Sequence, residues 1–366
     1  MNYGKMLEIK RRMDFNLTEP ETLVKLVEDA QEKGEKAQKD MNRLRKLSSG
    51  LTDLFEEEGL LRKESVLENI ILGYKSTVGI DGSFQLVGGV GGKWYAPISV
   101  ARVIFPDGVG SKPRVDIFWA RIEEIEERDF KPEQKASVMM LTGESKAILD
   151  WGISNNQAIV FVDGPIVDPP WCSNSSYIRF RCNAIRRCLQ KSLVIGCVKR
   201  SRDRFFAEEL IDSKRAKKKT LNNFPSDQHL MAYIFANVRY RGYHGPIHTK
   251  WIDISNAEYA NKLYKENGIR IFCFFFQKSV SSQVLRLDVP FLGGSEKTAV
   301  IDKKMVEVAK AVSDWTYPGQ DYPVPVFLAH EKCNIREGCA EVLYDEIMTR
   351  SKSVDPLNQT ISLQLR

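Results

Sequence analysis

The sequence predicts an α/β fold in which one mixed sheet is flanked by helices. Three strand-like segments come first, at 77–80, 94–105 and 114–122, with glycine-rich and proline-containing turns between them. From residue 133 onward, helical and strand-like segments alternate. Strands joined by short turns run antiparallel, whereas strands joined by a helical crossover run parallel. This order therefore predicts a mixed sheet with helices on both faces.

A long helix is predicted over residues 18–55. Thr18-Glu19-Pro20-Glu21 has the pattern of a capping box with proline in the first turn. Apolar residues then recur every seven positions, at Leu23, Ala30, Ala37, Leu44 and Leu51. Such a seam is typical of coiled coils. Two interpretations stay open, since the seam can face the helix's own domain or another molecule.

The other predicted elements divide the chain into three regions. Helices are expected at 133–150, 177–190, 301–315 and about 335–350, and strands at 158–162, 193–198, 269–276, 283–289 and the apolar run Val324–Ala329. Residues 200–265 are the least regular and are predicted to be an insertion. We expect an N-terminal helical region (1–75), an α/β domain (76–350) containing that insertion, and a C-terminal tail (351–366).

The composition excludes several classes of protein. Apolar residues make up 43% and charged residues 28%, as in a globular rather than a disordered chain. No apolar run approaches the roughly 18 residues of a membrane span, and the opening residues lack the apolar core of a secretion signal. The seven cysteines contain no CxxC pair, which disfavours a zinc finger and suits a reducing compartment. We therefore expect a cytoplasmic protein without a membrane partner.

Two predicted strands end in an aspartate followed by a glycine, at Asp81 and at Asp163. An ionised carboxylate beside a buried strand is costly unless it has a partner. A divalent cation such as Mn²⁺ or Mg²⁺ satisfies several such oxygens at once. Asp-Gly also occurs as a simple strand-ending turn, but two of them in this topology favour a metal site.

A third carboxylate is expected from the helix at 133–150. Glu144 lies on its apolar stripe with Leu141 and Ile148, so it should face the sheet. Glu133 lies near the same face, but a glutamate in the first turn is ordinary helix-dipole chemistry. We prefer Glu144, and the choice between the two stays open.

Basic residues and one histidine complete the candidate site. Lys199 and Arg200 follow the strand at 193–198, at the edge where functional groups of an open α/β sheet gather. A cation there can neutralise charge on a phosphate. His330 follows the run Val324–Ala329, where a histidine can bind metal or exchange protons, although a structurally satisfied histidine fits equally well.

The net charge of +6 permits nucleic-acid binding without proving it. Residues expected to contact a nucleic-acid backbone are Lys199, Arg200, Arg202, Lys217 and Lys218. In the helix at 177–190, the arginines are expected to lie mostly off the apolar stripe of Ile178, Cys182 and Ile185.

The chain resembles the NurA nuclease family of archaea and some bacteria over roughly residues 75–345. The resemblance is carried, in order, by GIDGS (79–83), FVDGPIVDPP (161–170), GCVKRS (196–201) and YPVPVFLAHE (322–331). It implies a ribonuclease H-like nuclease domain over 76–350 and Mn²⁺-dependent DNA cleavage. It also implies a ring-shaped homodimer, partnership with the hexameric DNA-translocating ATPase HerA, and a role in DNA end resection at double-strand breaks.

Carried over motif by motif, the resemblance implies that Asp81 and Asp163 bind metal and that Glu144 is the helical glutamate. Tyr322 and His330 take the places of a tyrosine and a histidine of the family, and Lys199 takes a basic position near the active edge. His330 would bind a metal or handle a proton, and Tyr322 would orient His330 or a phosphate.

Two other functions are alternatives to a nuclease. A non-catalytic DNA-binding clamp subunit of a helicase complex would keep the fold without the metal chemistry, and the intact carboxylate set disfavours it. A glycosidase with paired carboxylates is disfavoured by the basic strand edge. Dependence on a metal separates both from the nuclease.

Overall fold

The computed structural model describes residues 19–63, 67, 70–88, 93–126, 131–154, 157–169, 172, 174–294, 297–317 and 319–351. Thr18 of the predicted capping box, the end of the glycine-rich turn (89–92), Pro170 and nearly all of the predicted C-terminal tail lie outside these ranges. Within them, no helix combines the length and apolar character that a membrane crossing requires.

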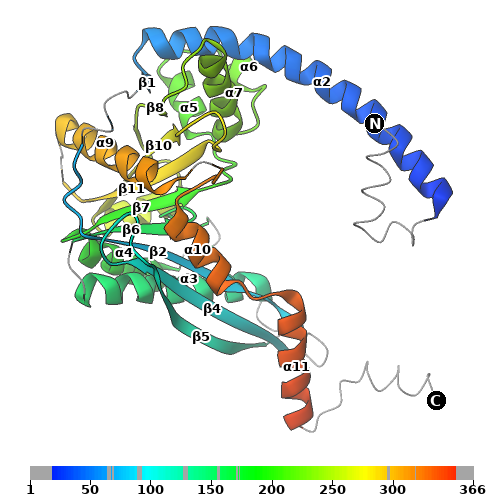
Figure 1. The fold of residues 1–366 in the computed structure, drawn as a ribbon, viewed down its shortest axis with the longest axis vertical. Coiled ribbons are helices and arrows are strands. Elements are labelled where there is room, and N and C mark those ends of the chain that lie inside the picture. The colour runs from blue at the N-terminus through cyan, green and yellow to red at the C-terminus, as the bar shows by residue number, and fades with distance from the viewer. Residues whose placement is uncertain are drawn as a thin grey trace.

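One mixed sheet organises the described residues, and it contains the predicted order of strands (Figure 1). Strands β2 (Ser76–Phe84), β4 (Lys93–Phe105) and β5 (Arg114–Glu126) form an antiparallel meander, and β6 (Ala158–Asp163) and β7 (Leu193–Val198) run parallel to β2. The order β5-β4-β2-β6-β7 confirms the predicted fold class, a ribonuclease H-like mixed sheet.

Six further strands belong to the same sheet. They are β1 (Leu61–Lys63), β3 (Val87–Gly88), β8 (Ile247–Thr249), β9 (Ile252–Asp253), β10 (Ile269–Gln277) and β11 (Leu285–Leu292). β10 and β11 confirm the two strands predicted near residues 270 and 285, and β11 lies antiparallel to β7. The sheet therefore continues well beyond the βαβ units.

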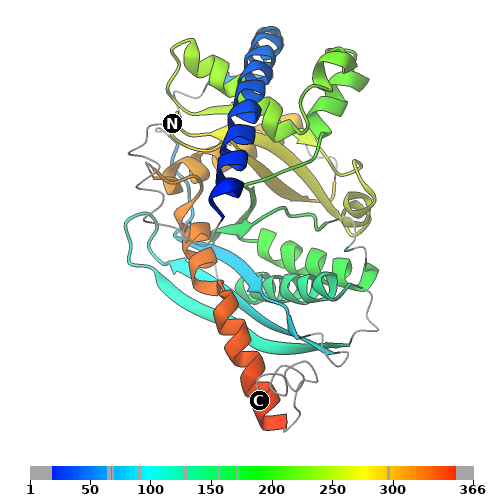
Figure 2. The same ribbon diagram turned by 90° about the vertical axis from the view of Figure 1, so that its right-hand side faces the viewer.

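Helices cover both faces of the sheet (Figures 1 and 2). α3 (Pro132–Ser154) and α4 (Ser175–Leu189) lie on one face, and α9 (Thr298–Trp315) and α10 (Val324–Cys333) lie on the other; α11 (Glu337–Ser351) follows. All of these helices except α10 were predicted.

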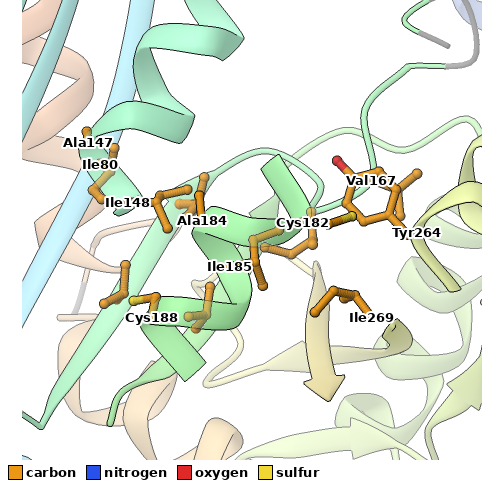
Figure 3. Close-up of a cluster of buried hydrophobic side chains, with 14 of the residues drawn as sticks. Ile80, Ala147, Ile148, Val167, Cys182, Ala184, Ile185, Cys188, Tyr264 and Ile269 are labelled. Carbon is orange, nitrogen blue, oxygen red and sulfur yellow. The ribbon is translucent and has the colours of Figure 1, made fainter. Parts of the chain in front are cut away.

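Alternation along the central strands divides the core into two layers. Val160 and Val162 of β6 belong to the layer under α3 and α4, whereas Ile159 and Phe161 belong to the layer under α9 and α10. Figure 3 shows part of the first layer, in which Ile185 of α4 is buried. Six of the seven cysteines are buried free thiols that pack as small apolar residues, and Cys339 is exposed.

The long N-terminal helix is confirmed as α2 (Pro20–Glu57), and its two halves differ. The C-terminal half buries Leu44, Leu51 and Phe55 in a third core shared with α5 (Phe205–Asp212) and α7 (Asp227–Tyr240). The N-terminal half extends away from the sheet, and Ala30 and Ala37 of the seam are exposed (Figure 1). Packing on its own fold thus accounts for the C-terminal half of the seam only.

The predicted insertion at 200–265 is largely regular. It contains α5, α6 (Lys218–Leu221), α7, α8 (Tyr259–Glu266), β8 and β9. Its strand β8 pairs with β1, which comes from the predicted N-terminal region. The boundaries of the three predicted regions stay a prediction.

The prediction of a strand at Val324–Ala329 is wrong, because these residues form most of α10. Pro323 precedes the helix and Pro325 lies in its first turn, where a missing N–H group costs no helical hydrogen bond. α10 passes so close to β2 that a Cβ on Gly79 would lie 2.0 Å from the carbonyl oxygen of Pro325. The apolar run is therefore a helix face packed on the sheet, and His330 extends from this helix.

Replacing Gly79 with alanine should destabilise the protein by about 1–3 kcal/mol, because the added methyl group displaces the backbone of α10. Urea unfolding measures the change. Gly50→Ala is the matched control: Gly50 lies inside α2, and a Cβ added there would meet no atom within 4 Å, so this change should stabilise by about 0.5–1 kcal/mol. Equal shifts in the two variants would contradict the close packing of α10 on β2.

Candidate metal centre

Asp81 and Asp163 lie on neighbouring parallel strands and face the layer of α10. Asp81 alternates with Ile80 along β2 and Asp163 with Val162 along β6, and Ile80 pairs directly with Val162. Asp163 ends β6, and Gly164 follows it with a φ of +89°, a turn conformation that favours glycine. Asp81 was predicted to end its strand, but β2 continues to Phe84.

His330 of α10 meets both aspartates. Its Nδ1 lies 2.8 Å from Asp81 Oδ2 and 3.7 Å from Asp163 Oδ2. The three side chains offer one ligand atom each within 4.8 Å of one another. The hydrogen bond to Asp81 raises the pKa of His330, because the protonated ring can donate to the carboxylate. The side chain is 45% exposed, so the group is open to solvent on this side.

Further contacts orient Asp81. Its Oδ1 accepts a hydrogen bond from the backbone N–H of Gly82 (2.8 Å), and the thiol of Cys333 donates to its Oδ2 (3.4 Å). The backbone N–H of Ile335 donates to Ser83 Oγ (3.3 Å), which ties the end of α10 to β2. The carboxylate and the helix that faces it are thus held by the same short stretch of β2.

Lys199 extends from the end of β7 to Asp163. Its Nζ lies 2.6 Å from Asp163 Oδ2 and 3.9 Å from the centre of the Tyr322 ring, a cation–π geometry. Burial lowers the pKa of Lys199, but the charge and hydrogen bond of Asp163 together with Tyr322 outweigh it, so the pKa is raised. Burial and the charge of Asp81 raise the pKa of Asp163, and Lys199 opposes them. Tyr322, predicted to orient His330 or a phosphate, contacts Lys199.

Glu144 approaches from α3, on the opposite face of the sheet, and is 2% exposed. It reaches β2 where Gly82 has no side chain: a Cβ there would lie 3.0 Å from Glu144 Oε1. Burial raises the pKa of Glu144 to about 8, against the opposing charge of Arg181. Glu133, the alternative third carboxylate, lies exposed in the first turn of α3.

These donors fit a divalent cation. Glu144 Oε2 is buried and has no hydrogen-bond partner among the described residues, and Arg181 Nη1 lies 3.8 Å away. A buried carboxylate oxygen without a partner is costly, and a bound cation would satisfy it. Carboxylates with one imidazole suit Mn²⁺ or Mg²⁺ better than a soft metal.

Sequence reasoning missed two buried residues behind Glu144. Arg181 of α4 is 1% exposed, so it is the exception among the arginines expected off the apolar stripe. Its Nε lies 3.4 Å from Asp168 Oδ1. Asp168 also accepts hydrogen bonds from the hydroxyls of Tyr177 (3.1 Å) and Tyr264 (2.5 Å). The available signal was the second aspartate of the FVDGPIVDPP motif, which lies among apolar and proline residues.

The predicted nucleic-acid residues occupy two places. Arg200 and Arg202 are exposed in the loop after β7, next to Lys199. Lys217 and Lys218 are exposed at the start of α6. α6 lies with α2 and α7 at one end of the molecule, whereas α10 lies near the middle (Figures 1 and 2). A nucleic acid contacting both places would have to extend along the protein.

The ribonuclease H-like strand order and the acidic cluster define a class of α/β proteins with a candidate metal centre on a central pair of parallel strands. A family model described as the NurA domain matches residues 33–335, so the chain belongs to the NurA family. This confirms the resemblance seen in the four motifs. A search of curated proteins finds no match.

One solved NurA structure shows a similar fold, and two further solved structures match with lower TM-scores. The crystal structure of the NurA nuclease from Sulfolobus solfataricus has a TM-score of 0.56 and 15% identity, covering 91% of this chain and 97% of that chain. A second NurA crystal structure has a TM-score of 0.40 and 11% identity, covering 77% and 90%. Endonuclease V from Ciona intestinalis, in complex with inosine-containing DNA, has a TM-score of 0.34 and 12% identity, covering 82% and 96%.

The stability of the metal-free protein should fall as pH rises from about 4.5 to about 8 because of Glu144. Its pKa is raised on folding, so between these values the folded state binds more protons than the unfolded state, and raising the pH favours unfolding. Glu144→Gln should flatten this dependence. Urea unfolding in EDTA at several pH values measures both proteins. Parallel pH profiles would show that Glu144 does not bind the extra proton.

Proposed function

We propose that this protein is a metal-dependent deoxyribonuclease that hydrolyses phosphodiester bonds, with Mn²⁺ as the preferred ion and Mg²⁺ as the alternative. The observation that carries the proposal is the convergence of Asp81, Asp163 and His330 in a chain of the NurA family. Glu144 lies outside this group of three, on the other face of β2, and its buried oxygen without a hydrogen-bond partner among the described residues supports it as a third carboxylate ligand.

Each residue of the proposed site has its own role in cleavage. A divalent cation held there supplies Lewis-acid stabilisation of the phosphate and makes a water molecule more acidic. Asp81 and Asp163 would hold the cation, with Glu144 as the third carboxylate ligand. His330 either binds it or moves a proton at its solvent-accessible ring. The ammonium of Lys199, which the Tyr322 ring contacts, neutralises charge on the scissile phosphate.

The proposed biological role follows from family membership. We propose exonuclease activity, with single-strand endonuclease activity as a second activity to be tested, in end resection at double-strand breaks. The proposed assembly is a homodimer acting with a HerA-type hexameric helicase. The alternative is a non-catalytic DNA-binding clamp subunit of such a complex, which the intact carboxylate cluster disfavours.

Asp81→Asn should reduce cleavage of end-labelled linear DNA at least about 100-fold, because it removes charge worth several kcal/mol to metal binding and the transition state. Wild-type cleavage should require Mn²⁺ or Mg²⁺ and stop in EDTA. Asp212→Asn, at an exposed aspartate ending α5, is the control and should leave cleavage unchanged. Full activity of the Asp81 variant would remove the proposed site. DNA binding without cleavage in any metal would favour the clamp.

Replacing Lys217 and Lys218 together with alanine should weaken DNA binding and reduce the slope of log K against log salt by about 2, since each phosphate contact contributes about 0.9. Fluorescence anisotropy in EDTA, over a range of salt concentrations, measures the slope without cleavage. The paired control is Lys262→Ala with Lys265→Ala, on the exposed side of α8. Identical slopes for wild type and the Lys217 and Lys218 variant would contradict a role in phosphate contact.

A further inference from the structure

The start of α7 links the segment 200–265 to the edge of the sheet that carries Lys199. Asp227, the first residue of α7, accepts hydrogen bonds from the backbone N–H groups that begin α5 (2.6 and 3.0 Å). The next residue, Gln228, directs its side chain to the loop after β7. Residues 199–204 of that loop belong to no helix or strand. Their positions therefore depend on such contacts rather than on a strand ladder.

The amide of Gln228 bonds to this loop on both sides of Arg200. Its Nε2 donates to the carbonyl oxygen of Lys199 (2.5 Å) and to that of Val284 (3.1 Å). Its Oε1 accepts from the backbone N–H of Ser201 (2.6 Å). Both N–H groups and the carbonyl are thus used, and all three partners are backbone groups. Such an arrangement fixes the path of the chain without needing a particular side chain in the loop.

The position of the Lys199 backbone decides where its ammonium lies. A lysine side chain has four rotatable bonds and loses roughly 2 kcal/mol of rotamer entropy when it is held in one place. The ammonium reaches Asp163 at 2.6 Å and the Tyr322 ring at 3.9 Å from a Cα that directly follows β7. Gln228 holds that point through a short hydrogen bond to the Lys199 carbonyl oxygen (2.5 Å), which also accepts a longer one from Gln283 Nε2 (3.3 Å).

We propose that Gln228 is a positioning residue for Lys199. It fixes the backbone from 199 to 201, and so keeps the ammonium against Asp163 at the metal centre. The consequence for cleavage rests on the proposed nuclease function, whereas the positioning itself does not. This also assigns the segment 200–265 a structural role at the metal centre, in addition to the basic residues at its surface.

Kinetics of Mn²⁺-dependent cleavage test the coupling between the two residues. Gln228→Ala and Lys199→Met should each lower kcat about 10- to 100-fold, the range found when an orienting partner is lost. KM should change little. The double variant should be no slower than Lys199→Met alone, because Gln228 acts through Lys199. Additive losses in the double variant would overturn the proposal.

A matched control separates positioning from general stability. Gln277→Ala removes an amide that accepts from Arg239 Nε (3.2 Å) and donates to the Ser282 carbonyl (2.8 Å), at the end of β10. It should lower Tm about as much as Gln228→Ala while leaving kcat unchanged below both melting temperatures. An equal fall in kcat in this control would assign the loss to stability and overturn the proposal.

A second readout does not depend on catalysis. Acylation of the protein with an N-hydroxysuccinimide ester, followed by peptide mass spectrometry, reports how accessible the Lys199 ammonium is. Its rate should rise several-fold in Gln228→Ala and not in Gln277→Ala. An unchanged rate overturns the positioning. If wild-type protein cleaves no DNA with any metal, the proposed nuclease function fails, and the acylation rates still decide the role of Gln228.

Discussion

The close approach of α10 to β2 at Gly79 is the contact on which the rest of the site depends. No side chain larger than hydrogen fits between the strand and the carbonyl of Pro325. Because the helix lies this close, His330 and Cys333 both reach the Asp81 carboxylate. The two prolines that begin the helix set its start. The positions of the charged residues at this site thus depend on one glycine and two prolines.

Each carboxylate of the site lies near a basic side chain, although His330 also lies 3.7 Å from Asp163 and Arg181 lies closer to Asp168 than to Glu144. Asp81 is paired with His330, Asp163 with Lys199 and Glu144 with Arg181. Burial still raises the pKa of Asp163 and of Glu144, so the cations do not fully compensate for the loss of water. Stability given up at such a site is the usual accompaniment of function. The two apolar layers of the core stabilise the rest of the fold.

The sequence was sufficient for the fold class and for the convergence of Asp81 and Asp163, because each aspartate follows the apolar residues of a strand and strands joined by helical crossovers run parallel. The prediction was wrong at Val324–Ala329, since a six-residue apolar run fits a strand as well as a buried helix. Pro323 and Pro325 mark the start of the helix that these residues form. The pairing of Arg181 with Asp168 was not predictable. It depends on α4 and the loop after β6 meeting in space, which no local pattern encodes.

Gly82 has a consequence for how the two layers of the molecule are related. Elsewhere the sheet separates the α3 side from the α10 side, but here Glu144 and Asp81 lie near one another across a strand that has no side chain between them. The charge of Asp81 contributes to the raised pKa of Glu144, after burial, which is the larger cause. The sheet therefore does not separate these two carboxylates electrostatically at this point. Whether Glu144 holds a proton depends in part on a charge that lies on the other side of the sheet.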